Sequence, residues 1–421
     1  MNQVLRFNYK KLSVQNVVTG GQAATDIHTH VIFHHSGDNY WLGTEAGLLI
    51  IDIQSGNPSL VQKRYSNPYS ITDNIVSSIY RDKEGGIWAG TYFGGINYYS
   101  NQYNNFRKYF PEPGVNSLSG NIVHEIQKDG FGKLWVGTED AGLNEVDLKT
   151  SHIRHFVPDG TPESISYRNI HGLVVDGDKL WIGTYEHGLD VMDLRTNRIV
   201  KHYNAAMNGS SFGSNFIVTL YRTKNGGILV GTWNGLFKYN RANDDFSILP
   251  FDYVHIQSIH EDENGTIWVS SYGGGVYFWN PVSKQKGHIA YEAGKTGGLI
   301  NNYVNGMYED SKRRYWFCTE AGLSEYDPKT RQFVNYTVEN GLPANQVFRM
   351  LEDKTGNLWI STSKGLSSFD PKTKHFTSYH TANGLPTEQF NYNSSFKDVD
   401  GTMYFGTVKG MVSFRPESFI K

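Results

Sequence analysis

One motif recurs nine times along this chain, and the spacing of its copies constrains the fold more than any other feature. In the second copy the motif runs from Asp82 to Thr91 with the sequence DKEGGIWAGT. Seven of the nine tryptophans occupy its central slot, and successive copies are 47, 47, 46, 48, 39, 48, 43 and 45 residues apart. Such a period predicts one supersecondary unit packed against copies of itself. The nine central positions are Trp41, Trp88, Trp135, Trp181, Leu229, Trp268, Trp316, Trp359 and Tyr404.

Each copy has the pattern of four short strands. A strand such as 74–80 leads into an Asp-x-x-Gly turn, where aspartate can bond the local backbone and glycine can take a positive φ. The tryptophan strand follows, then a third strand such as 142–147 and an aromatic-rich fourth such as 331–336. Four short strands in each repeat are typical of propeller blades. We therefore predict an all-β β-propeller fold of nine four-stranded antiparallel blades, with the tryptophans packed between neighbouring blades.

The last copy ends after its third strand, so a strand from elsewhere must complete its sheet. Residues 5–12 would close all nine blades into a single ring. Residues 105–110 would instead close copies three to nine into a seven-bladed ring and leave the first two copies as a partial array. The period alone does not distinguish these two arrangements.

Charge and cysteine content narrow the classes of partner. The 421 residues carry 39 basic and 41 acidic side chains, a formal net charge of −2, which does not favour nucleic acid or an anionic membrane. No run approaches the roughly 20 apolar residues that span a bilayer. The single cysteine, Cys318, excludes an internal disulfide. It stands where other copies have glycine, so we expect a small buried residue there and not a nucleophile.

Several stretches resemble a known family. The consensus Asp-x-x-Gly-x-Ile-Trp-x-Gly-Thr-x-x-Gly-Leu is similar to the two-component-regulator propeller repeat, which fills the sensor region of hybrid two-component systems in gut Bacteroidetes. The resemblance extends to segments 70–74, 90–99 and 137–143 and to the Asn-Gly-Leu-Pro turns at 340–343 and 383–386. In that family two seven-bladed propellers precede an immunoglobulin-like module, a membrane helix, a histidine kinase, a receiver and a DNA-binding domain.

This resemblance implies how the chain divides and what it does. Residues 102–421 match the second propeller, closed by strand 105–110 as seven blades, and residues 1–101 match the last blades of the first. We favour this arrangement over the nine-bladed ring. The resemblance also implies a periplasmic fragment of a sensor, non-catalytic, with a membrane link only through downstream regions that this sequence lacks. We expect a small-molecule or oligosaccharide ligand, a possible homodimer and no nucleic-acid partner for this segment.

The least uniform positions lie in the turns between second and third strands and in the links that enter first strands. In a propeller both sets emerge on one face, where ligands commonly bind. Aromatic faces stack on the apolar side of a pyranose, while charged and amide groups bind its hydroxyls. Trp233 and Tyr185 are the strongest candidates for ligand contact, because a large aromatic side chain in a short turn gains little burial unless a ligand covers it. The predicted rim residues are Trp233, Tyr185, His187, Tyr272, Glu139, Glu320, Arg168, Tyr303 and Lys364.

A histidine cluster near the N-terminus is the one metal candidate that the sequence suggests. Alternation along a strand could place His28, His30 and His34 on one side, with His35 next to them. A solvated or packed edge strand explains the same pattern without a metal. We expect no metal and no cofactor.

Catalysis is the main alternative to ligand sensing. The Asp-x-x-Gly-x-x-Trp run is similar to the Asp-box of sialidase propellers, where the box is structural. Such an enzyme needs an arginine cluster on one face, and Arg168 and Arg349 alone do not provide it. A propeller sialidase or polysaccharide lyase, and a protein-interaction scaffold, therefore stand as alternatives to a non-catalytic sensor.

Overall fold

The computed structural model describes residues 5–8, 13–16, 28–55, 58–100, 105–205, 213–251, 254–294 and 297–419. Strands dominate these residues, and short 3₁₀ turns occur at η2 (Val338–Asn340), η3 (Thr381–Asn383) and η4 (Pro416–Phe419). In this part of the chain no helix has the length and apolar character needed to cross a membrane. The chain forms two compact units, one of Met1–Asn104 with Ala382–Gly384 and one of the remaining residues.

The first unit contains the first two copies of the motif. A two-stranded sheet pairs β1 (Leu5–Asn8) with β2 (Ser13–Asn16). The first copy is a four-stranded antiparallel sheet of β3 (Thr29–Ser36), β4 (Asn39–Thr44), β5 (Leu48–Asp52) and β6 (Pro58–Val61). The second copy has three strands, β7 (Val76–Arg81), β8 (Ile87–Thr91) and β9 (Gly95–Tyr99).

The second unit contains seven four-stranded antiparallel sheets, one for each of copies three to nine. In six of them the four strands follow one another in chain order. The first three of these sheets are β11 (Val123–Lys128), β12 (Lys133–Thr138), β13 (Leu143–Asp147) and β14 (Ile153–Phe156); β15 (Ile170–Asp176), β16 (Lys179–Thr184), β17 (Leu189–Asp193) and β18 (Arg198–Tyr203); and β19 (Ile217–Arg222), β20 (Ile228–Thr232), β21 (Gly235–Asn240) and β22 (Asp245–Ile248). The next three are β23 (Ile256–Glu261), β24 (Ile267–Ser271), β25 (Gly275–Trp279) and β26 (Lys286–Ile289); β27 (Val304–Glu309), β28 (Tyr315–Thr319), β29 (Gly322–Asp327) and β30 (Gln332–Tyr336); and β31 (Val347–Glu352), β32 (Leu358–Thr362), β33 (Gly365–Asp370) and β34 (His375–Tyr379).

The last sheet takes its fourth strand from the start of the unit. β35 (Phe390–Lys397), β36 (Met403–Thr407) and β37 (Gly410–Phe414) are completed by β10 (Arg107–Tyr109), which pairs antiparallel with β37. The competing segment 5–12 pairs instead within its own unit through residues 5–8, and residues 9–12 lie outside the described residues, as does the expected boundary at 101/102. Among the described residues the sheet of the second copy has three strands, because β10, which follows β9 in the chain, pairs in the sheet of the ninth copy.

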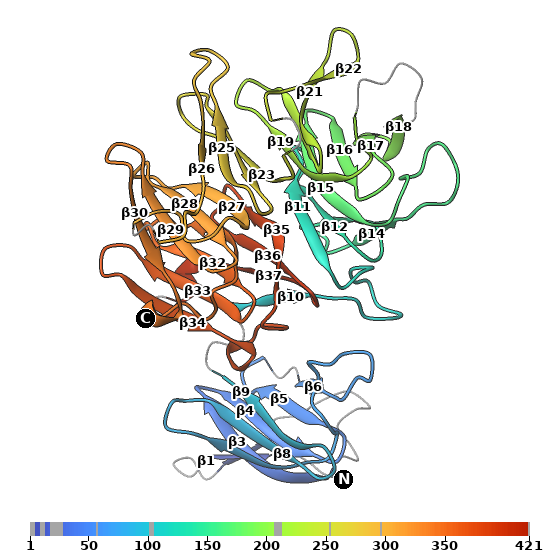
Figure 1. Ribbon diagram of the computed structural model, residues 1–421. Coiled ribbons are helices and arrows are strands. Elements are labelled where there is room, and N and C mark those ends of the chain that lie inside the picture. Colours follow the sequence, from blue (N-terminus) through green and yellow to red (C-terminus); the bar gives the residue numbers. More distant parts are fainter. Residues whose placement is uncertain are drawn as a thin grey trace. The chain divides into compact units, whose positions relative to one another are not determined.

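First strands of neighbouring sheets lie side by side through the second unit. Each of β11, β15, β19, β23, β27, β31 and β35 contacts the next, and β35 also contacts β11. The amide of Asn391 on β35 donates to the carbonyl of Val123 at 3.2 Å, and Lys128 on β11 forms an ion pair with Asp398. Figure 1 shows these first strands toward the middle of the unit and the fourth strands, such as β14, β22 and β34, toward its outside.

The repeated motif builds its own turn and fixes its own tryptophan. Oδ1 of Asp262 accepts the backbone N–H groups of Asn264 and Thr266, each at 2.9 Å, and Gly265 takes a φ of +72°. Oδ2 of the same carboxylate accepts the indole N–H of Trp268 at 3.0 Å. The aspartate therefore joins the turn to the second strand. The same indole bond occurs in Asp82–Trp88, Asp129–Trp135, Asp310–Trp316 and Asp353–Trp359.

The tryptophans of the second unit pack against the next sheet, as predicted. Trp316 is fully buried and packs with Val347, Met350 and Ile360 of the following sheet. Such contacts remove an indole from water on both faces, which makes this slot a main source of stability. Cys318, two residues further on, is buried in the same cluster, and burial raises the pKa of its thiol to about 12. A thiol of that pKa is a poor nucleophile, as expected for a packing residue.

Candidate functional site

First strands bulge near their start, which turns one side chain of each toward the neighbouring first strands. On β11 the register shifts between Val123 and Glu125, so that His124 is the extra residue. On β15 the extra residue is His171, between Ile170 and Gly172. A β-bulge re-aims the side chain that it carries. The bulged residues of the other first strands in the second unit include Val218, Gln257, Asn305 and Phe348.

The turns after the second strands meet the links that enter the first strands. The N–H of Glu139 donates to the carbonyl of Ile122 at 2.9 Å, and the N–H of Glu320 donates to that of Tyr303 at 3.1 Å. Tyr185 and Tyr272 make the same bond to Asn169 and His255. Both sets of predicted positions therefore lie at the same end of each sheet, which is the arrangement that a shared binding face requires.

Six aromatic side chains at this end form a continuous row, which we name the aromatic arc: Tyr185, Phe216, Trp233, His255, Tyr272 and Tyr303. Trp233 stacks on Phe216 with ring centroids 4.7 Å apart, and Tyr185 meets Trp233 edge-on at 5.8 Å. His255 lies between Trp233 and Tyr272, at 5.5 and 5.6 Å. Tyr272 meets Tyr303 at 4.8 Å. Trp233, Tyr272 and Tyr303 remain 40%, 55% and 43% exposed, so their contacts leave much of each ring open to solvent.

Four of the predicted rim residues thus lie in one row, and the others differ in their surroundings. His187 is exposed and stacks on Tyr167 at 4.3 Å. Arg168 and Lys364 are exposed, and within the described residues neither forms an ion pair. Glu320 accepts bonds from the amides of Asn305 at 2.7 Å and Gln346 at 2.6 Å, so its carboxylate is held by its neighbours.

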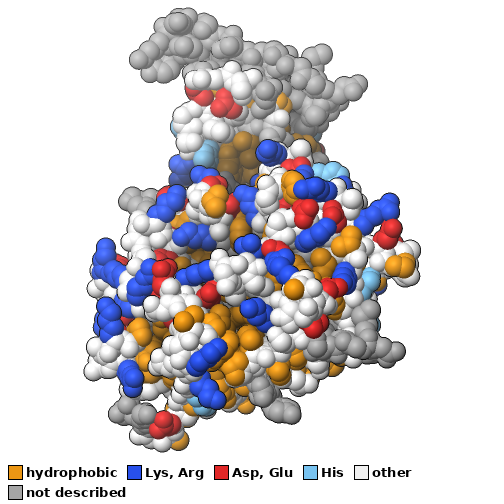
Figure 2. Space-filling model, turned by 90° about the horizontal axis from the view of Figure 1, so that it is seen from above, with side chains coloured by type: hydrophobic (Ala, Val, Ile, Leu, Met, Phe, Trp, Pro, Cys, Tyr) orange, Lys and Arg blue, Asp and Glu red, His pale blue; other side chains and the backbone are white. Residues whose placement is uncertain are grey.

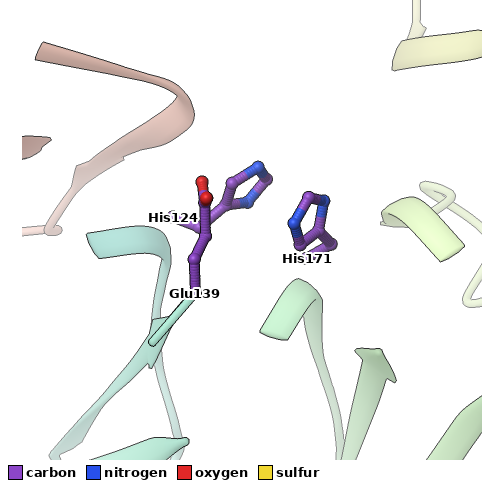
Figure 3. Close-up of side chains that lie close together, drawn as sticks. All are labelled: His124, Glu139 and His171. Carbon is purple, nitrogen blue, oxygen red and sulfur yellow. The ribbon is translucent and has the colours of Figure 1, made fainter. Parts of the chain in front are cut away.

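Glu139 belongs to a second group, which the sequence did not reveal. Its carboxylate lies with the imidazoles of His124 and His171, and the three donor atoms are all within 4.8 Å of one another. Figure 3 shows the two rings beside each other, with the carboxylate next to His124. Ring centroids of the histidines are 4.1 Å apart, and the residues are 0% and 3% exposed. We name this group the His–His–Glu cluster.

Burial sets the protonation of the cluster. It lowers the pKa of His124 well below its ordinary value, with His171 and then Arg349 adding to the effect, and lowers the pKa of His171 to about 4. Both imidazoles are therefore neutral near pH 7. Burial also raises the pKa of Glu139, against a bond from Asn391 that lowers it.

The sequence does carry a signal for the two histidines. In a regular half-buried strand apolar residues alternate, but here Val123 is followed by Ile126 and Ile170 by Leu173, a spacing of three. That spacing indicates one extra residue, and in both strands the residue after the first apolar position is histidine. The distance in the chain between the two strands hides their proximity.

The N-terminal histidines have the surroundings of an exposed edge strand. β3 is the edge strand of its sheet, with His30 and His34 exposed. The ring of His34 bonds the carbonyl of Gly37 at 2.8 Å, and His35 stacks on Trp41 at 4.8 Å. Among the described residues it is the His–His–Glu cluster, and not these histidines, that brings three ligand atoms together.

Arg349 and Arg168 have different surroundings. Its guanidinium donates to Asn393, and its pKa is lowered by burial, with Glu125 opposing the effect. Arg168 is exposed. The pair therefore does not form the arginine face that a sialidase would need.

Comparison with known proteins agrees with the resemblance of the repeats. The two-component-regulator propeller model matches residues 70–93, 117–140, 248–273, 298–321 and 341–364. No curated protein sequence matches. The extracellular domain of the hybrid two-component system BT3049 from B. thetaiotaomicron is 25% identical with a TM-score of 0.75, covering 98% of this chain and 54% of that one.

Two further solved structures share the fold. The extracellular domain of the one-component system BT4673 from B. thetaiotaomicron is 19% identical with a TM-score of 0.58, covering 99% of this chain and 61% of that one. Virginiamycin B lyase from Staphylococcus aureus is 12% identical with a TM-score of 0.53, covering 73% of this chain and 97% of the lyase. The chain thus spans little more than half of the two Bacteroides domains. Five segments of the chain match the two-component-regulator propeller model, and its sheets share the β-propeller fold of these extracellular domains.

Proposed function

We propose that the chain is the ligand-binding propeller segment of a bacterial two-component sensor, that it acts without catalysis, and that an oligosaccharide binds along the aromatic arc. The observation that carries the proposal is the arc itself. Three of its rings are 40–55% exposed although each contacts a neighbour. A row of exposed rings leaves apolar surface in contact with water, which is unfavourable unless a ligand covers it.

A seven-bladed ring of residues 102–421 would make the arc part of one continuous face. The pairing of β10 with β37 and the bond from Asn391 to Val123 support this closure, because both join the last sheet to the start of the unit. Residues 1–101 would then be blades of a neighbouring propeller. In such a ring the arc spans four consecutive sheets or their entering links, from Tyr185 to Tyr303.

The chemistry of the face suits a sugar. Aromatic planes stack on the C–H face of a pyranose, and the exposed side chains of His187, Arg168 and Lys364 can donate hydrogen bonds to hydroxyl or acidic substituents. Figure 2 shows Lys and Arg side chains interspersed with Asp and Glu on one face of the molecule, and neither sign forms a continuous patch there. This mixture does not favour a nucleic acid as the ligand. A periplasmic location, as for the extracellular domains of the relatives, and a homodimer complete the proposal.

Calorimetric titration with a panel of plant and host oligosaccharides tests the arc. We expect Trp233→Ala and Tyr272→Ala each to weaken binding of the best glycan about tenfold or more, since a lost stacking contact of about 1.4 kcal/mol gives that factor. Trp88→Ala is the matched control, because Trp88 is also 40% exposed but lies in the first unit.

Equal affinity of Trp233→Ala and the unchanged protein for that glycan would remove the arc from the proposal. Chromatography of the same glycans after incubation addresses catalysis. Intact glycans fit a sensor, whereas shortened or unsaturated products would establish a sialidase or lyase activity instead.

A further inference from the structure

The His–His–Glu cluster is not explained by packing or by hydrogen bonding. Nδ1 and Nε2 of His124 and Nδ1 of His171 are buried and have no hydrogen-bond partner among the described residues. A buried polar group without a partner costs about 1–3 kcal/mol, and here three such atoms lie together. Neighbouring rings do not satisfy them, because the contacts of His124 with His171 and Tyr392 are ring contacts at 4.1 and 4.7 Å.

The group contains the donor set of a three-ligand metal site. Two neutral imidazoles and one carboxylate bind Zn²⁺ in catalytic sites, with the fourth position left to water or another ligand. The three ligand atoms here are within 4.8 Å of one another, and a tetrahedral site with bonds of about 2.0–2.1 Å needs separations of about 3.4 Å. A contraction of at most about 1.4 Å is within reach of side-chain rotation, because Glu139 stands in a turn and both histidines stand at bulges.

The second ligand sphere is also present. Oε1 of Glu139 accepts a bond from the amide of Asn391 at 3.0 Å, and that amide is anchored on the carbonyl of Val123 at 3.2 Å. Such a bond orients the carboxylate and leaves Oε2 for a metal.

We propose that His124, His171 and Glu139 bind one divalent transition-metal ion, with Zn²⁺ as the first candidate. Imidazole ligands favour zinc and its neighbours in the first transition row over Mg²⁺ and Ca²⁺, which prefer all-oxygen sites. This metal site is separate from the proposed oligosaccharide-binding face, and the proposal does not depend on oligosaccharide binding. It nevertheless places a metal beside the arc, because His171 meets Tyr185 at a centroid distance of 4.8 Å.

The test uses the full chain without an affinity tag, stripped with chelator and titrated with ZnCl₂ by calorimetry. We expect one equivalent of zinc to bind tightly. His171→Ala and Glu139→Gln should each weaken binding at least tenfold, and Asn391→Ala should weaken it about tenfold through the lost second-sphere bond. The matched control is the double variant His30→Ala/His34→Ala, which removes two exposed histidines and should leave the high-affinity equivalent unchanged.

Cobalt gives a measurement that does not need a variant. Co²⁺ bound by two imidazoles and a carboxylate in four-coordinate geometry has strong visible absorption. Added zinc should displace the cobalt and remove this absorption. Absence of both a tight zinc equivalent and this absorption in the unchanged protein would overturn the proposal. So would tight zinc binding that survives in His171→Ala but is lost in His30→Ala/His34→Ala. Glycan titrations remain informative in either case, since Trp233 is not in the cluster.

Discussion

The same motif stands in two different environments in the two units. Trp88 and Trp268 each donate their indole N–H to the aspartate six residues earlier, at 2.8 and 3.0 Å. Trp88 is nevertheless 40% exposed, whereas Trp268 is 6% exposed. Trp268 packs with Val304 and Met307 of the next sheet, but the ring contact found for Trp88 is with Tyr98 of its own sheet.

This difference separates the structure that one repeat forms by itself from the burial that a neighbouring sheet provides. The turn and the indole bond form within one copy, because all their partners lie within seven residues. Burial comes from the next sheet. The second sheet of the first unit accordingly exposes large apolar residues, including Tyr80, Ile96 and Phe93 at 64%, 70% and 79%. Repeat proteins owe much of their stability to such interfaces between neighbours.

The largest expected effect comes from truncating the two tryptophans. Trp268→Ala should lower the free energy of unfolding of the second unit by about 3–5 kcal/mol, because it leaves a cavity between two sheets. Trp88→Ala should cost the first unit about 1 kcal/mol or less, since much of that ring is already in water. Urea unfolding followed by hydrogen exchange on peptides of each unit measures both values. Equal costs would contradict the comparison.

The aspartate of the motif should show the same contrast in acid. Burial raises the pKa of Asp262, but bonds from Trp268, Thr266 and Tyr315 outweigh it, and the net pKa lies below 3.8. A carboxyl whose folded pKa is lowered contributes stability above its unfolded pKa and loses it as the pH falls through the folded value. We therefore expect Asp262→Asn to cost about 1–3 kcal/mol at pH 7, and the cost should fall as the pH drops through the folded pKa of the carboxyl.

Asp82→Asn is the control for this acid dependence. The indole bond from Trp88 lowers the pKa of Asp82, but that carboxyl is open to solvent, so the same substitution should change stability less. Melting temperatures of both variants between pH 7 and pH 3 provide the measurement. A pH-independent cost for Asp262→Asn would show that its charge is not involved.

The smallest effect is expected at Trp181, where the motif lacks its aspartate. Val175 stands six residues before this tryptophan, and the buried indole N–H has no partner among the described residues. Trp181→Phe should therefore change the free energy of unfolding by about 1 kcal/mol or less, since it removes an unpaired donor as well as some packing. Trp135→Phe should cost more, because Asp129 loses the indole bond of 2.8 Å. Chemical denaturation of the two variants compares them.

Much of the fold could be predicted because its causes are local. Aspartate, glycine and tryptophan at fixed offsets specify a turn between two strands, and β7, β13 and β30 begin within two residues of the expected positions. The packing of the second unit's tryptophans between sheets also followed from the sequence, because a shared period sets one sheet beside the next, whereas Trp88 of the first unit is 40% exposed.

The candidate site could be predicted only in part. Tyr185, Trp233, Tyr272 and Tyr303 were recognised one turn at a time, and their joining into an arc through Phe216 and His255 depends on the angles between sheets. The carboxylate of Glu320 accepts bonds from Asn305 and Gln346, which lie in other segments of the chain. The sequence around a loop residue does not specify which side chains of neighbouring strands it contacts in the folded protein.

The sequence by itself determined the strands, the turns and the position of each tryptophan in the second strand of its repeat. These features depend on hydrogen bonds and on the alternation of apolar and polar residues within a few positions. The tertiary structure decided that β10 pairs with β37, residues more than 300 positions apart. It also decided that two bulges bring His124 and His171 to one carboxylate. Both outcomes depend on which sheets lie next to each other and in what register, and that is settled by packing over the whole unit.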